Sequence, residues 1–240
     1  MGLTINFGVE SNTNSPKVAR QLLEKIRQIA LDTPFEHVGE VGEYFNVNDP
    51  RDWHLIQSSE YIRYPWNDHI STAVYPEHLY VFSIAVGNGC EELNIGLGKY
   101  PKTVVVDYRP HQDTKLFDKD GQFSYSKWSD YARKNGIYAL DYEKSYPKEV
   151  KINLPKYRWS AFCKTEYANL PDCGGIENFI RCHLNIIRFL DKVKLIPKLD
   201  VFVDDEGEYG DFSRNGVEYN GTYSLQTLLK NKDVSAQGIA

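Results

Sequence analysis

Sulfur is scarce in this sequence. Its 240 residues include four cysteines and one methionine, which is the initiator. No two cysteines have the CxxC spacing that is typical of zinc sites and thioredoxin-like redox sites. We therefore expect reduced thiols, no metal and no other cofactor. The cysteines are Cys90, Cys163, Cys173 and Cys182.

Long apolar runs and an excess of positive charge are also missing. No segment approaches the roughly 18 apolar residues that span a bilayer, and residues 1–20 lack the pattern of a secretory signal. The 28 Lys and Arg residues are outnumbered by 33 Asp and Glu residues, which gives a formal net charge of −5. These absences predict a soluble, cytoplasmic protein without a membrane partner, and they disfavour nucleic-acid binding as its main role.

Tyrosine, by contrast, is abundant, with 17 residues. A tyrosine ring is apolar but ends in a hydroxyl group, so it suits positions that are dry at one end and wet at the other. Most tyrosines lie in segments without a regular pattern. We expect them either to anchor these segments or to form a binding surface.

Hydrophobic periodicity predicts the order strand, helix, strand near each end of the chain, with a hairpin between them. Ser15 followed by Pro16 marks the start of the first helix. Residues 48–77 show no clean period and are predicted to be irregular with one short helix. The predicted strands are 3–9, 38–47, 79–86, 93–97, 103–108, 158–167 and 199–203, and the predicted helices are 16–32, 126–134, 176–193 and 224–229.

These elements predict a single α+β domain over residues 1–240. We expect a two-layer sandwich with a mostly antiparallel sheet and two main helices on one face. The shared order at the two ends is compatible with a duplicated split βαβ unit of the ferredoxin-like kind. The polar stretch 109–151 is predicted to be an inserted excursion, and residues 230–240 are predicted to fray.

One group of residues could carry nucleophilic catalysis. Cys163 lies on a predicted strand, His183 lies on the apolar face of the helix 176–193, and Asp204 follows the closing strand in an acidic turn. A thiol nucleophile needs an imidazole base within reach and a third group that orients the base. The alternative interpretation is that His183 is a packed core residue and Cys163 a small apolar one.

Two other sites are less compatible with the sequence. Cys163, Cys173, Cys182 and His183 have the atom types of a zinc site, but two of them are adjacent on a helix and point about 100° apart. The glycine-rich stretch 87–98 has Glu92 in place of the third glycine of a dinucleotide-binding loop. We predict a hairpin turn there and no nucleotide.

The segment 48–77 also contains aromatic residues that could stack on a ligand. They are Trp53, Tyr61, Tyr64 and Trp66, with Arg51 and Arg63 nearby in the sequence. Such rings can bind a base, a sugar or a protein surface. They can equally anchor an irregular loop onto the sheet.

Several motifs together resemble a family of uncharacterised bacterial proteins of similar length. They are the opening residues 1–5, Gly89-Cys90-Glu91, the block 162–184 and the turn 204–207. The resemblance covers most of the chain except residues 109–151. It implies a bacterial origin and brings no activity, cofactor or site residue.

The sequence leaves open whether the protein is an enzyme. We expect a non-catalytic binding or interaction module that uses its aromatic-rich insertions to bind a small molecule or a protein. The alternative is a hydrolase or transferase that uses Cys163, His183 and a carboxylate from residues 204–208.

Overall fold

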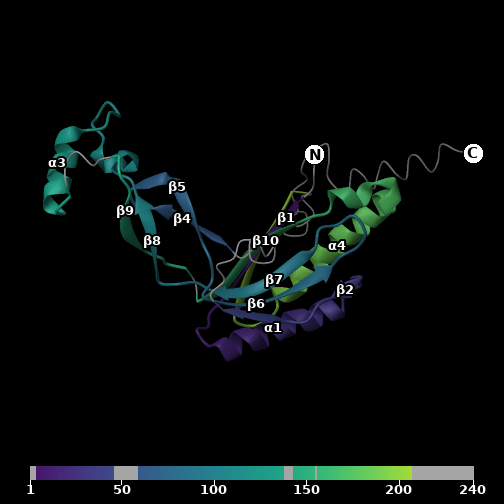
Figure 1. The fold of residues 1–240 in the computed structure, drawn as a ribbon. Helices are drawn as coiled ribbons and strands as arrows, with labels where there is room; N and C mark the ends of the chain where they lie inside the picture. The colour runs from purple at the N-terminus through teal and green to yellow at the C-terminus, as the bar shows by residue number, and fades with distance from the viewer. Residues whose placement is uncertain (1–3, 46–58, 138–142, 155, 207–240) are drawn as a thin grey trace, which may run out of the picture. The chain divides into compact units, whose positions relative to one another are not determined.

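The computed structural model describes residues 4–45, 59–137, 143–154 and 156–206 (Figure 1). Trp53, the helix predicted over 224–229 and the tail 230–240 lie outside these residues. The chain forms two compact units, and each is described by itself. Unit 1 comprises residues 1–58, 76–99 and 155–240, and unit 2 comprises residues 59–75 and 100–154. Within the described residues, no helix has both the length and the apolar content needed to cross a bilayer.

Unit 1 is built on one sheet with the strand order β11-β1-β10-β7-β6-β2, and β3 also pairs with β6. All of these pairs are antiparallel. The strands are β1 (Thr4–Ser11), β2 (His37–Val38), β3 (Gly42–Phe45), β6 (His78–Ala85), β7 (Leu93–Lys99), β10 (Tyr157–Lys164) and β11 (Leu199–Asp205).

Two long helices pack with this sheet around one core. The helices are α1 (Pro16–Leu31) and α4 (Gly175–Val193). The Ser15 hydroxyl accepts a hydrogen bond from the Val18 backbone N–H at the start of α1, as the sequence predicts. Buried side chains of both helices and of the sheet form a single hydrophobic cluster. Helix α1 contacts α4 (Figure 1). The predicted α+β sandwich is confirmed.

The two ends of the chain are placed differently in the sheet. Strands β10 and β11 lie on either side of β1 and are connected through α4, which makes a split βαβ unit. Helix α1 instead leads from β1 to β2, at the opposite end of the strand order. The predicted ferredoxin-like duplication is therefore not confirmed. Two 3-10 turns, Glu166–Asn169 and Pro171–Cys173, connect β10 to α4.

The described residues of unit 2 form two antiparallel strand pairs and one helix. Its elements are β4 (Glu60–Tyr64), β5 (Asn67–Val74), β8 (Thr103–Tyr108), β9 (Tyr146–Lys151), α3 (Tyr125–Lys134) and the 3-10 turns Pro110–Gln112 and Thr114–Leu116. The hairpin β4–β5 replaces the irregular structure predicted for this part of 48–77. A shift in register between Arg63 and Tyr64 interrupts the two-residue alternation that would have identified the strands.

Candidate functional site

The predicted catalytic histidine lies at the centre of a buried polar network in unit 1. His183 Nδ1 lies 3.0 Å from Thr165 Oγ1, and His183 Nε2 lies 2.9 Å from Asp205 Oδ1. The His183 side chain is completely buried and that of Asp205 is 3% exposed. Both ring nitrogens of His183 therefore have a hydrogen-bonding partner, one in Thr165 and the other in Asp205.

Strand register explains why Asp205 takes part and Asp204 does not. Residues directly opposite each other on antiparallel strands point to the same face, and side chains alternate along a strand. Cys163 and Asp205 are both opposite Ile5 of β1, whose side chain is in the core. Asp204 is opposite Asn6 instead, and its side chain is exposed.

The Cys163 side chain points to the same side of the sheet as Asp205, but its thiol is not hydrogen-bonded to His183. Its thiol donates to the Glu91 backbone carbonyl at 3.3 Å, while both nitrogens of His183 are engaged by Thr165 and Asp205. Burial raises the pKa of the Cys163 thiol far above its ordinary value, so the sulfur stays protonated. The structure therefore brings His183 together with Asp205 and Thr165, and not with Cys163 or Asp204. Catalysis by Cys163 stays a prediction that this arrangement does not favour.

The aromatic residues predicted to bind a ligand are mostly internal to unit 2. Trp66 is 4% exposed, and its ring contacts Tyr64 and Tyr108 at centroid distances of 4.8 and 5.1 Å. Tyr64 is half-buried, whereas Tyr61 is 72% exposed. Among the described members of the set, Tyr61 alone presents its ring to solvent. This supports the anchoring interpretation for Trp66.

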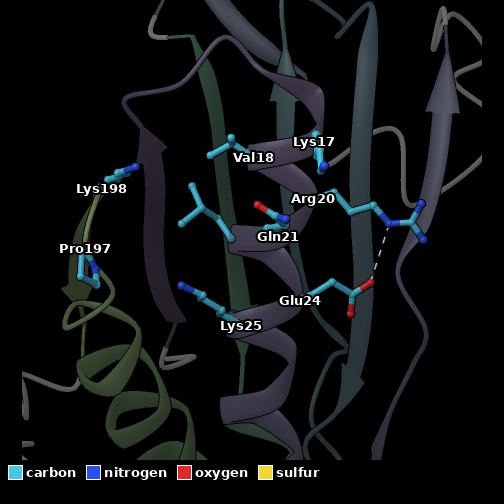
Figure 2. Close-up of a pocket in the computed structure, with 9 residues that line it drawn as sticks. Lys17, Val18, Arg20, Gln21, Glu24, Lys25, Pro197 and Lys198 are labelled. Carbon is cyan, nitrogen blue, oxygen red and sulfur yellow. Dashed lines mark ion pairs between the residues drawn. The ribbon is translucent and has the colours of Figure 1, made fainter.

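A groove beside α1 is a site that the sequence interpretation missed. The groove has a volume of about 680 Å³ and lies within unit 1, between the outer face of α1 and the corner that precedes β11 (Figure 2). We call it the α1 groove. Its lining residues are Lys17, Val18, Arg20, Gln21, Leu22, Glu24, Lys25, Pro197 and Lys198.

Charge in the α1 groove is unbalanced. Arg20 lies 3.9 Å from Glu24 and 3.8 Å from Glu43, so its charge is compensated. In Figure 2, the pair of Arg20 and Glu24 points away from Pro197, whereas Lys25 and Lys198 reach toward the gap from opposite sides. Within the part of the chain that the structure describes, no carboxylate pairs with Lys25 or Lys198.

The position of Lys198 depends on an unusual backbone conformation. Lys198 has a φ of 73°, a left-handed conformation that is uncommon for a residue other than glycine. Its backbone carbonyl accepts a hydrogen bond from the Asn12 N–H at 3.3 Å, which ties the corner to the segment that leads into α1. The chain thus holds a lysine at a tight corner opposite α1.

Metal binding receives no support from the described residues, which contain no group of three or more His, Cys, Asp and Glu side chains suited to hold an ion. The four cysteines are free thiols, as expected. Comparisons with protein-family models, with curated proteins and with solved structures gave no match. The relation to an uncharacterised bacterial family stays an expectation, and what points to a function is the arrangement of the chain's own residues.

Proposed function

We propose that the protein is a non-catalytic binding protein and that the α1 groove takes a small amphiphilic anion. The observation that supports this proposal is the pair of uncompensated lysines, Lys25 and Lys198, on opposite sides of a groove with apolar residues. A volume of about 680 Å³ lies within the roughly 300–1,000 Å³ that is usual for small-molecule sites.

The lining also favours a particular class of ligand. Val18 and Pro197 supply apolar surface, whose contact with an apolar body contributes about 25 cal/mol per Å² of area removed from water. The ammonium groups of Lys25 and Lys198 would pair with a carboxylate, sulfonate or phosphate head. Because the groove is open to solvent, this attraction should weaken as salt is added.

The test is a fluorescence titration with 8-anilinonaphthalene-1-sulfonate, an apolar ring system with one sulfonate. We expect saturable binding to the folded protein, competition by dodecanoate, and much weaker competition by dodecanol, which lacks the charge. The double substitution Lys25→Glu with Lys198→Glu should raise the dissociation constant at least tenfold, which corresponds to about 1.4 kcal/mol.

The matched control is Arg188→Glu with Lys192→Glu, two charge reversals at exposed positions on α4 that do not line the groove. This variant should bind the probe as the unmodified chain does. Equal loss of affinity in the control and the double variant would mean that only net charge matters. Dodecanol competing as well as dodecanoate would also overturn the proposal.

A further inference from the structure

Strand β11 forms an edge of the unit 1 sheet. It pairs with β1 on one side, and the described residues place no strand on its other side. A sheet edge presents backbone N–H and C=O groups that can pair with a further strand. When an extended peptide is added to such an edge, the backbone hydrogen bonds give affinity and the side-chain contacts give specificity. The side chains of β11 therefore indicate which kind of strand fits this edge.

The register with β1 identifies the backbone groups that point to the open side. The Glu206 N–H donates to the Thr4 carbonyl at 3.1 Å, and at the other end the Lys198 carbonyl accepts from the residue after β1 at 3.3 Å. Hydrogen-bonded pairs alternate with non-hydrogen-bonded pairs along an antiparallel ladder. Every second residue between these two ends therefore bonds to β1. The N–H and C=O groups of Val201 and Val203 point to the open side instead.

The outward side chains of β11 form a short exposed row. Val201 and Val203 pack against the core, so Asp200, Phe202 and Asp204 point to the opposite face of the sheet, and all three are exposed. Phe202 is 53% exposed. Its ring lies over Gly8 of β1, where an added Cβ atom would overlap the ring. The absence of a side chain there lets an aromatic ring lie on the sheet with a carboxylate on either side along the strand.

The charges of this row are not compensated. Among the residues that the structure places, no Lys or Arg pairs with Asp200 or Asp204, whereas Glu10 on the neighbouring strand pairs with Arg158 at 3.2 Å. A second copy of the chain that paired antiparallel about Phe202 would bring Asp200 of one copy opposite Asp204 of the other. Like charges directly opposite each other destabilise a strand pair, whereas opposite charges stabilise it. The edge therefore disfavours a copy of itself and favours a basic strand.

We propose that the open edge of β11 binds an extended basic peptide as an added antiparallel strand. The peptide carries Lys or Arg opposite Asp200 and Asp204 and an apolar residue opposite Phe202, which is a basic–x–apolar–x–basic pattern. These are non-hydrogen-bonded positions of the new ladder, where opposing side chains come closest. The inference is independent of ligand binding in the α1 groove.

The probe is the peptide Thr-Lys-Thr-Phe-Thr-Lys-Thr with blocked ends and a tetramethylrhodamine label, titrated with the full chain and followed by fluorescence anisotropy. We expect saturable binding that weakens as salt is added. Asp200→Lys with Asp204→Lys should raise the dissociation constant by about tenfold or more. A peptide with Glu in place of both Lys residues should bind poorly to the unmodified chain and better to this double variant.

Methylation of peptide nitrogens separates strand addition from attraction between charges alone. The two threonines that flank the phenylalanine lie opposite Val201 and Val203, so their N–H groups donate to β11 and N-methylation of both should abolish binding. The N–H groups of the phenylalanine and the lysines point away from β11. N-methylation of the phenylalanine and one lysine should therefore change the dissociation constant by less than about twofold.

The matched control is Glu77→Lys with Glu92→Lys, two charge reversals at exposed positions of unit 1 outside β11. This variant should bind the peptide as the unmodified chain does. Absence of saturable binding, equal binding of the two methylated peptides, or equal loss of affinity in the two double variants would overturn the proposal. A dimer of the unmodified chain in sedimentation velocity that is lost with Asp200→Lys and Asp204→Lys would assign the edge to a second copy and would also overturn it.

Discussion

Two histidines of unit 1 each connect a hydroxyl group to a carboxylate, at opposite ends of β10. His78 lies 2.9 Å from the Tyr157 hydroxyl and 2.8 Å from Glu43, and His183 links Thr165 to Asp205. A buried imidazole with both nitrogens bonded fixes the positions of its partners. At the end that contains Thr165, the side chain of His183 is fully buried, so its contribution to folding should be large.

His183→Leu should lower the free energy of unfolding by about 3 kcal/mol, because it leaves the Asp205 carboxylate and the Thr165 hydroxyl buried without their imidazole partner. Urea unfolding followed by circular dichroism measures the change. Asp204→Asn is the matched control, since this exposed neighbour should change stability by less than about 0.5 kcal/mol. A His183→Leu variant that unfolds at the control's urea concentration would show that the network adds no stability.

Predicting the residues of this site requires knowing which side chains of β11 point toward the core. The helical wheel places His183 on the apolar face, and the structure confirms that its side chain is buried. The sequence predicts a carboxylate from residues 204–208, with Asp204 as the named candidate, and the alternation of Leu199, Val201 and Val203 continues to Asp205. Applying the same alternation one residue further would have identified the carboxylate that faces the core.

At the scale of elements, the predicted helices 16–32, 126–134 and 176–193 agree with α1, α3 and α4 to within one residue at each end. Their starts follow local rules, as in the capping of α1 by Ser15 ahead of Pro16. The α1 groove could not be predicted in the same way, because it also needs Pro197 and Lys198, which are distant from α1 in sequence. Local patterns identify the exposed face of α1, but only tertiary packing determines what lies opposite it.

The aromatic residues of unit 2 are a second case in which the sequence does not show what the side chains contact. Lys148 Nζ on β9 lies 3.7 Å from the ring centroid of Tyr108 and 4.3 Å from that of Trp66. Partial burial lowers the pKa of Lys148, as expected for an ammonium group that is partly shielded from water. The aromatic residues thus surround a cation that belongs to the same unit, which composition alone cannot distinguish from a ligand.

Lys148→Ala should destabilise unit 2 by about 1–2 kcal/mol, because it removes the cation–π contacts with Tyr108 and Trp66 and the alkyl chain that covers these rings. Chemical denaturation followed by tryptophan fluorescence checks this value. Lys151→Ala, an exposed position on the same strand, serves as the control and should be nearly neutral. Equal effects of the two substitutions would mean that the contact with the rings contributes nothing.

For the whole molecule, the division into two units was not visible in the sequence. Residues 109–151 were predicted to be an excursion, and the structure places them in one unit with residues 59–75. The strand order could not be predicted from the sequence either, because sheet neighbours such as β1 and β10 are far apart in the chain. Periodicity describes each element but contains no information on which elements pair.

Separate hydrophobic clusters imply that the units lose structure separately. Trp66 and Trp128 belong to small clusters of unit 2, whereas the large cluster lies in unit 1. We expect hydrogen exchange in increasing urea to expose the peptides of 59–75 and 100–154 together, and at lower urea than those of 76–99 and 157–206. A single urea concentration at which all peptides lose protection would contradict this expectation.

The position of β1 between β10 and β11 has a consequence for the nascent chain. Ribosomes release the strand of residues 4–11 first, but both of its sheet neighbours come after residue 156. The strands of unit 2 are all available once residue 151 has emerged. During synthesis, therefore, both edges of β1 stay unpaired at a stage when unit 2 can already fold. Unpaired strand edges promote aggregation, so we expect the nascent chain to be prone to it during this interval.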